Sequence, residues 1–182
     1  AGFEENLERF KYLFENAVAI RMRSDVKVGT CLSGGLDSAS IAALAARMHS
    51  NDASTRFSAI TAKSTEIAND ESHFAEMVVS LYDLNWIISQ PSYEDFAATI
   101  SDVTIAQEEP FGSASIVMQY HVMRAAAENG IKVLLDGQGG DEVFMGYERY
   151  FVAHFRQLLR QFSWGQALSD LRAMKQNNAT MN

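Results

Sequence analysis

The chain has 182 residues and a formal net charge of −8 at pH 7, with 47% hydrophobic and 21% charged residues. This composition is typical of a globular protein with a substantial core, and one domain of this length buries roughly 70% of its unfolded surface. The acidic balance argues against nucleic acid or an anionic membrane as a partner, and no run of about 18 apolar residues predicts a membrane span. A single cysteine, Cys31, excludes an internal disulfide, so we expect a reducing, cytoplasmic setting.

Hydrophobic periodicity predicts helices that alternate with short strands. Apolar residues spaced three and four apart predict an amphipathic N-terminal helix over residues 5–22. The predicted strands cover residues 26–32, 56–62, 85–89 and 132–136, and the predicted helices between them cover residues 37–49, 69–82, 92–105 and 115–129. Ser92 is the expected N-cap of its helix, and Gly130 is expected to close the last helix of this set. From about residue 148 to residue 175 the pattern is helical and contains no strand signal.

This alternation predicts an α/β fold in which a parallel sheet carries helices on both faces, followed by a helical C-terminal extension. We expect a main domain over residues 1–150 and an incomplete extension over residues 151–182. In such sheets, ligands bind at the carboxyl ends of the strands, where the strand order reverses. Two glycine-rich loops follow predicted strands, so both are expected at that edge.

The first loop contains SGGLDS, residues 33–38. Because Gly34 and Gly35 lack a Cβ, backbone N–H groups can approach an anion there, and the following helix directs its N-terminus to the same point. Asp37 would repel a bare phosphate and suits a phosphate that carries a divalent cation. An ordinary helix start with Ser and Asp caps remains the alternative. No G-K-[ST] follows, so this is not a Walker A loop.

The second loop, residues 137–147, contains GQGGDE followed by Gly146 and Tyr147. Its carboxylates, Asp141 and Glu142, supply the oxygen ligands that Mg²⁺ prefers. We expect Asp37 and Asp141 to hold one magnesium ion that carries a triphosphate. Taken alone, a solvated acidic turn is the commoner meaning of such a segment.

The pair of motifs, SGGLDS at 33–38 and GQGGDEVFMGY at 137–147, resembles the synthetase domain of the asparagine synthetase family. That domain belongs to the ATP pyrophosphatases, which have an adenine nucleotide α-hydrolase-like fold. The similarity extends from about residue 26 to residue 150 and includes ANDESHFAEMVVSLY at 68–82. The resemblance implies an amide-forming ligase: ATP adenylates a carboxylate (aspartate or a related acid) and releases pyrophosphate, and ammonia then displaces AMP.

The resemblance also implies roles for individual residues. Those that would hold the pyrophosphate end of ATP are Ser33, Gly34, Gly35, Asp37 and Ser38. Those that would contact the adenine through backbone groups are Leu32, Ile60 and Gly137. The implied Mg²⁺ ligands are Asp37 and Asp141, and the implied catalytic residues are Gln138 and Glu142. Tyr147, with Glu142, lies where the family lines the pocket for its adenylated intermediate.

Three departures from the family pattern affect what we expect. The chain begins at Ala1, without the cysteine nucleophile of the family's glutaminase domain, so we expect a fragment that does not hydrolyse glutamine. Gln138 replaces a glutamate that handles the ammonia proton, and an amide is no general base near neutral pH, so an amide other than asparagine fits at least as well. The family's catalytic lysine is expected beyond Asn182, so this fragment alone is expected to be inactive.

Other functions stay open. A non-catalytic ATP-binding scaffold or regulatory module would keep the same two loops, and a homodimer is not excluded. A pyrophosphatase that modifies tRNA or thiolates its substrate is disfavoured by the single cysteine and the acidic charge. Glu108 and Glu109 could contact substrate near the same edge, although a cap or loop role is favoured. The four histidines share no metal-ligand spacing.

Overall fold

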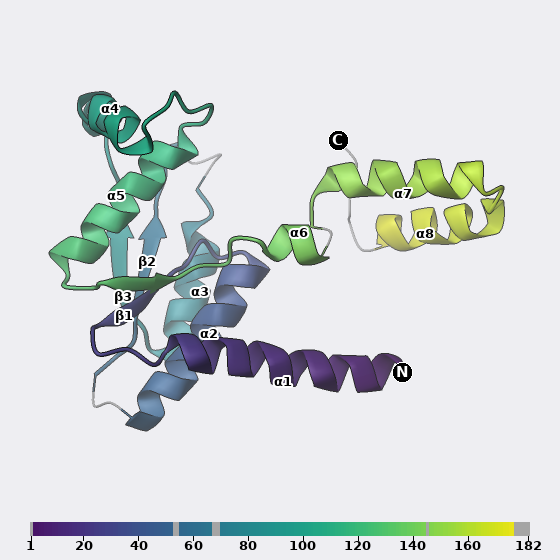
Figure 1. The fold of residues 1–182 in the computed structure, drawn as a ribbon, viewed down its shortest axis with the longest axis horizontal. Coiled ribbons are helices and arrows are strands. Elements are labelled where there is room, and N and C mark those ends of the chain that lie inside the picture. Colours follow the sequence, from purple (N-terminus) through teal and green to yellow (C-terminus); the bar gives the residue numbers. More distant parts are fainter. Residues whose placement is uncertain (1, 53–54, 67–69, 145, 177–182) are drawn as a thin grey trace. The chain divides into compact units, whose positions relative to one another are not determined.

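Short runs of apolar and β-branched residues form the strands, and longer segments with apolar residues three and four apart form the helices. The computed structural model describes residues 2–52, 55–66, 70–144 and 146–176. They divide into two compact units, Ala1–Gly137 and Gln138–Asn182. Figure 1 shows the elements of both units along the chain. The predicted division into residues 1–150 and 151–182 stays a prediction.

The first unit contains a four-stranded sheet and five helices among its described residues. Its strands are β1 (Val28–Cys31), β2 (Ser58–Ala62), β3 (Asn85–Ser89) and β4 (Val133–Leu135). Its helices are α1 (Phe3–Arg21), α2 (Leu36–Asp52), α3 (Ser72–Tyr82), α4 (Tyr93–Gln107) and α5 (Ser115–Glu128). The predicted α/β fold is confirmed, and so are the four predicted strands, with shifts of a few residues at their ends.

The sheet is parallel throughout, with the strand order β3-β2-β1-β4. The chain first moves outward from β1 through β2 to β3, with α2 and α3 as its connections. It then returns through α4 and α5 to place β4 on the other side of β1. The direction of winding therefore reverses between β1 and β4, and the carboxyl ends of these two strands flank the crevice where ligands bind in open parallel sheets.

Two separate hydrophobic cores cover the two faces of the sheet, because successive strand residues point to opposite sides. Ala59 of β2 belongs to the core shared with α1, α2 and α3, whereas the next residue, Ile60, belongs to the core shared with α5. Small residues at the centre of α2 let this helix approach the strands closely: Ala42, Ala45 and Ala46 are all buried. On the other face, α5 contributes Val122 and Ala126. Figure 1 shows α5 on one face of the sheet and α2 with α3 on the other.

Side-chain hydrogen bonds order the starts of two of the helices. Ser92 is the N-cap of α4, as predicted: its hydroxyl accepts the Asp95 N–H at 3.1 Å, and the Asp95 carboxylate accepts the Ser92 N–H at 2.9 Å. Helix α3 begins at Ser72, because the Asp70 carboxylate accepts both the backbone N–H and the hydroxyl of Ser72. Asn69, where this helix was predicted to begin, lies outside the described residues.

The second unit is helical in its described residues. It contains α6 (Gly140–Phe144), α7 (Glu148–Arg160) and α8 (Trp164–Gln176). The predicted helical segment from 148 to 175 is present, but a turn divides it after Arg160. Helices α7 and α8 pack against each other, and an ion pair of 2.8 Å between His154 Nε2 and an Asp170 carboxylate oxygen links them when His154 is protonated.

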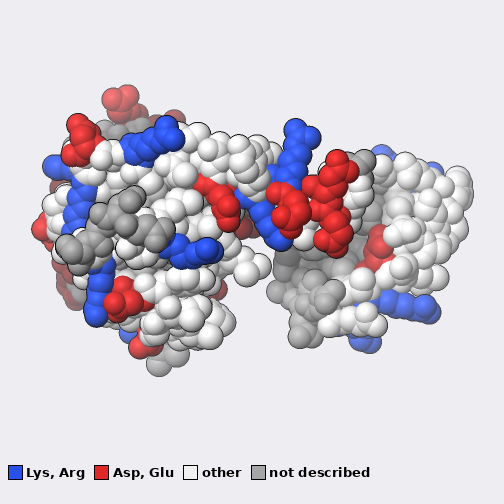
Figure 2. Space-filling view, turned by 90° about the horizontal axis from the view of Figure 1, so that it is seen from below, with Lys and Arg blue, Asp and Glu red and all other residues white. Residues whose placement is uncertain are grey.

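None of the helices in the described part of the chain has the length and hydropathy that a membrane crossing requires. On the face shown in Figure 2, Lys and Arg side chains are interspersed with Asp and Glu, and no broad basic patch is visible there.

A buried histidine makes the stability of the first unit sensitive to pH. His121 of α5 is 4% exposed and shares a 3.1 Å hydrogen bond with the Thr99 hydroxyl of α4. Burial lowers the pKa of His121 below 6.5, the Arg124 charge acts in the same direction, and Asp95 opposes both. As the pH falls, the unfolded chain therefore binds a proton at His121 at a higher pH than the folded chain does. The free energy of unfolding consequently falls as the pH drops through about 6.5.

We expect urea unfolding to show lower stability at about pH 5.5 than at about pH 7.5, where neutral His121 is favoured in the folded state. The variant His121→Gln should have a smaller pH dependence in this range, and His73→Gln, which changes an exposed histidine, should keep that of the wild type. Equal wild-type stability at both values would show that His121 does not control this titration.

Candidate functional site

The loop after β1 is built around two serine hydroxyls. The Ser38 hydroxyl donates to the Gly35 carbonyl at 3.1 Å and accepts the Ser33 N–H at 3.2 Å. The Ser33 hydroxyl accepts the Gly35 N–H at 3.3 Å and lies 2.9 Å from Ser38 Oγ. Because the single Ser38 hydrogen is already donated to Gly35, Ser33 is the donor between the two hydroxyls. These bonds hold the loop in a closed turn at the start of α2.

Gly34 is packed against α3, the second helix that follows it in the chain. It has a φ of +95°, which L side chains rarely adopt, and a Cβ there would lie 2.7 Å from Phe74 Cβ and 2.8 Å from the Ala75 nitrogen. The backbone of the loop therefore rests directly on the first turns of α3. Asp70 therefore acts on the loop indirectly: its carboxylate orders the start of α3, and α3 contacts Gly34.

Gly137, the first residue of the second glycine-rich loop, lies against the first turn of α2. A Cβ at Gly137 would be 3.0 Å from Asp37 Cβ and 3.0 Å from the Ser38 nitrogen. The segment that leaves β4 thus passes the start of α2 at the point where the winding of the sheet reverses. Asp37, Ser38 and Gly137 are brought together there, as predicted for the carboxyl edge.

The start of α2 directs unpaired peptide dipoles toward this point. Gly35 accepts the Ala39 N–H at 2.9 Å as the first bond of the helix, so the N–H groups of the first three helical residues have no partner within the helix. An anion at this position is stabilised by those N–H groups and by the helix dipole. Asp37, in the same turn, carries the only carboxylate of the SGGLDS loop.

Two of the three residues predicted to contact adenine, Leu32 and Ile60, are buried in or directly after strands of the sheet. The Leu32 N–H donates to the Ile60 carbonyl at 2.8 Å, and the Leu32 carbonyl accepts the Thr61 hydroxyl at 2.8 Å. Leu32 and Ile60 are each 1% exposed. A carbonyl oxygen can accept a second hydrogen bond, so the carbonyls of Leu32, just after β1, and of Ile60, the middle residue of β2, both keep acceptor capacity.

Cys31, the last residue of β1, is half-buried beside this edge. Burial raises the pKa of its thiol to about 12, and the negative charge of Asp136, just after β4, acts in the same direction. The Gln119 amide donates to the sulfur at 3.9 Å. A thiol with this pKa is a poor nucleophile, and a structural role for Cys31 accords with it.

We therefore expect Cys31 to react with iodoacetamide at about pH 8 at least a hundredfold more slowly than an unhindered cysteine in a peptide, because the thiolate fraction is so small. Asp136→Asn should accelerate the reaction by removing the nearby negative charge. Mass spectrometry of the alkylated chain over time measures both rates, and a wild-type rate equal to that of the peptide would contradict this assignment.

The other predicted site residues belong to the second unit, and two of them contact each other. The Tyr147 hydroxyl donates to a Glu142 carboxylate oxygen at 2.8 Å. This bond lowers the pKa of Glu142 and raises the pKa of Tyr147. The Arg149 guanidinium lies 4.5 Å above the centre of the Tyr147 ring. Gln138 and Asp141 are exposed.

Within the described residues, no three His, Cys, Asp or Glu side chains gather closely enough to form a metal site. The two predicted magnesium ligands, Asp37 and Asp141, belong to different compact units. Glu108 ends α4 with a φ of +60° and is exposed, as is Glu109, so Glu108 fits the cap role favoured by its sequence position.

Sequence patterns did not reveal three residues that shape this edge. Besides burial, the charge of Asp136 raises the pKa of the Cys31 thiol, and the hydrogen bond from Gln119 lowers it. Asp70 orders the start of α3. An aspartate two residues before a serine at the start of a helical pattern is a known turn signal and could have identified Asp70. No comparable signal exists for Gln119, which reaches Cys31 from 88 residues away.

A parallel sheet with a glycine-serine loop and a helix N-terminus at its winding reversal defines an open α/β protein, a class in which ligands bind at the carboxyl edge of the sheet. The family model described as asparagine synthase matches residues 9–181, which is nearly the whole chain. The chain belongs to the asparagine synthase family.

Curated relatives agree with this assignment. A putative glutamine-hydrolysing asparagine synthetase of Methanocaldococcus jannaschii is 33% identical over 155 residues, which cover 85% of this chain and 29% of that protein. One of Mycobacterium tuberculosis is 33% identical over 138 residues, covering 76% of this chain and 20% of that protein. The amidase chyE of Penicillium rubens is 27% identical over 157 residues, which cover 81% of this chain and 23% of that protein. The chain thus spans less than a third of the length of these relatives.

Proposed function

We propose that this chain is the ATP-binding part of an amide-forming ligase. In the proposed reaction, a carboxylate oxygen attacks the α-phosphorus of ATP, the bond to the β-phosphate oxygen breaks, and pyrophosphate leaves. Ammonia then attacks the acyl carbon of the adenylate, AMP departs, and the nitrogen loses a proton to give the amide. Aspartate or a related acid is the proposed substrate, and a glutaminase domain of the parent protein is the proposed source of ammonia.

The observation that carries this proposal is the convergence at the crevice between β1 and β4. The SGGLDS loop, the N-terminus of α2 and the close approach of Gly137 all meet at that edge. A polyphosphate needs backbone N–H donors and room to approach the backbone closely. The loop and the helix N-terminus provide the donors, and glycine, which has no Cβ, leaves the room. Ser33, Gly34, Gly35, Asp37 and Ser38 are the residues proposed to bind the pyrophosphate portion of ATP.

Binding would require the loop hydroxyls to exchange partners. Ser33 and Ser38 now bond to each other and to loop backbone, and rotation of either hydroxyl would redirect a donor to a phosphate oxygen without moving the backbone. The carbonyls of Leu32 and Ile60, with the backbone of Gly137, are proposed to meet the adenine base. This arrangement would bind ATP across the ends of β1, β2 and β4.

The donor set fits a hard divalent cation, because both proposed ligands, Asp37 and Asp141, are carboxylates. Bound Mg²⁺ would neutralise charge on the leaving pyrophosphate. Asp37 lies in the turn that would hold the phosphates, so the cation would offset the repulsion between its carboxylate and the polyphosphate.

In the second unit, Glu142 and Tyr147 are proposed to line the pocket for the adenylated intermediate. The hydrogen bond from Tyr147 lowers the pKa of Glu142 and so favours its ionised form, which would attract an ammonium ion or a protonated amino group of a substrate. Gln138 is proposed to orient the attacking nitrogen through its amide, since an amide donates and accepts hydrogen bonds but takes up no proton near neutral pH.

Gln138 favours a second candidate, a module that binds ATP without forming an amide. The exchange of labelled pyrophosphate into ATP separates the two candidates. With a set of carboxylates that includes aspartate, the parent protein that contains this chain should exchange label only when its own substrate is present. The absence of exchange with every acid of the set would favour the binding module. The parent protein is used because this chain spans less than a third of the length of its curated relatives.

A further inference from the structure

An open pocket of about 700 Å³ lies at the amino edge of the sheet, opposite the glycine-rich loops. Its lining includes the first residue of each of three strands: Val28 of β1, Ser58 of β2 and Asn85 of β3. Small-molecule sites usually have volumes of roughly 300–1,000 Å³. The pocket is therefore large enough for a small ligand, and no residue proposed to bind ATP lines it.

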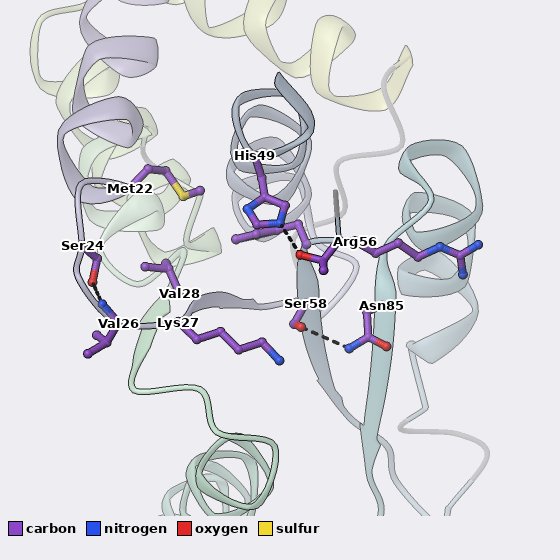
Figure 3. A pocket seen from close by; sticks show the side chains of 11 residues that line it. Met22, Ser24, Val26, Lys27, Val28, His49, Arg56, Ser58 and Asn85 are labelled. Carbon is purple, nitrogen blue, oxygen red and sulfur yellow. Dashed lines mark hydrogen bonds between the residues drawn. The ribbon is translucent and has the colours of Figure 1, made fainter. Parts of the chain in front are cut away.

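The lining combines an apolar wall with polar groups held in place. Met22, Val26 and Val28 form one side of the pocket in Figure 3. On the other side, the Asn85 amide donates to the Ser58 hydroxyl at 3.1 Å, and Ser58 is 1% exposed. This pair needs little reorganisation to receive a ligand, because the register of β2 and β3 places the two residues side by side.

The charge of the lining is unusual for so acidic a chain. Among the residues that the structure describes, the lining includes Lys27, His49 and Arg56 but no Asp or Glu, although the chain as a whole has a net charge of −8. Arg56 is neutralised by Asp83, whose carboxylate lies 3.0 Å from Arg56 Nε.

Lys27 carries the uncompensated charge of the pocket. Its ammonium group donates to the Asn129 carbonyl at 3.3 Å, and no carboxylate within the described ranges forms an ion pair with it. In Figure 3 the side chain of Lys27 extends across the pocket, with its nitrogen toward the side of Ser58 and Asn85. An ammonium group has three donors, so Lys27 can bind an anion while keeping the bond to Asn129.

We propose that this amino-edge pocket binds a small organic anion, in which a compact apolar body carries one carboxylate or phosphate group. Lys27 binds the anionic group, the apolar wall covers the body, and Asn85 orients the ligand. The interaction weakens as salt is added, since Lys27 is exposed and its charge is screened. The site lies beyond the proposed ATP reaction and does not depend on it.

Titration followed by amide NMR spectra of the isotope-labelled chain tests the proposal, with phenyl phosphate and benzoate as probes and benzyl alcohol as the neutral control. At least one anion should give saturable shifts at Val28, Ser58 and Asn85, and comparison of the two identifies the preferred group. Lys27→Met should weaken that binding by about fivefold, the usual upper effect of one exposed ion pair. Lys132→Met removes an exposed charge just before β4 that does not line the pocket, and it should leave the affinity unchanged.

Three results would overturn the proposal: no saturable shifts at these amides with either anion, equal shifts with benzyl alcohol, or equal losses in the two lysine variants. Lys27 is exposed, so both variants should fold, and the dispersion of their spectra checks this. Lys27→Gln, which keeps a polar side chain without the charge, should weaken binding like Lys27→Met. Shifts confined to residues 33–38 would indicate phosphate binding at the other edge and would count against the pocket.

Discussion

Gly34→Ala should lower the free energy of unfolding by about 2–4 kcal/mol, because the added Cβ causes both backbone strain and a steric clash. An L side chain at a φ of +95° is strained, and the new Cβ would overlap Phe74 Cβ and the backbone nitrogen of Ala75. Neither neighbour can move without shifting α3. The same displacement should open the loop between Ser33 and Ser38 and abolish measurable ATP binding. Urea unfolding and calorimetric titration measure the two effects.

Gly35→Ala is the matched control, because it makes the same chemical change one residue away. Gly35 has no positive φ, and its nearest contact to an added Cβ would be Ser33 Oγ at an ordinary 3.5 Å. We expect a loss of less than about 1 kcal/mol for this variant. If both variants lost the same stability, the contact of Gly34 with α3 would not be the cause.

Gly137→Ala should mainly affect ligand binding. The added Cβ would lie 3.0 Å from Asp37 Cβ and the Ser38 nitrogen, so the start of α2 must shift by a few tenths of an ångström. Small displacements of binding groups are costly, and we expect ATP affinity to fall by about tenfold while the free energy of unfolding falls by about 1–2 kcal/mol. Calorimetric titration with ATP and Mg²⁺ checks the affinity.

The control for this variant is Gly112→Ala, since a Cβ at Gly112 meets nothing within 4 Å. That variant should bind ATP as the wild type does. Unchanged affinity in Gly137→Ala, measured on a folded chain, would place the nucleotide away from the crevice between β1 and β4.

Local patterns were sufficient to predict the α/β fold. The apolar strands, the Ser92 cap and the spacing of apolar residues in the helices are properties of neighbouring residues, and each was found close to its predicted place. The position of the SGGLDS loop at the carboxyl edge also follows from local order, because a loop after a parallel strand must leave at that edge.

The contacts that shape the site depend on the tertiary structure and were not predictable in this way. The contact of Gly34 with Phe74 and Ala75 depends on how α3 packs, and the raised pKa of Cys31 depends on burial in the folded chain and then on Asp136, from another strand's end. Similarly, the turn after Arg160 interrupts a pattern that reads as continuous helix. The roles of Gln138, Asp141 and Glu142 still rest on the family resemblance.

The central claim is that the loop after β1 binds the phosphates of ATP together with a cation. Calorimetric titration of this chain with ATP, in the presence and absence of Mg²⁺, tests it most directly when Asp37→Ala is compared with Asp25→Ala, an exposed aspartate outside the loop. We predict magnesium-dependent binding in the wild type and in Asp25→Ala, and at least a tenfold loss in Asp37→Ala. Absence of binding to the folded wild-type chain, or equal binding by Asp37→Ala, would contradict the claim.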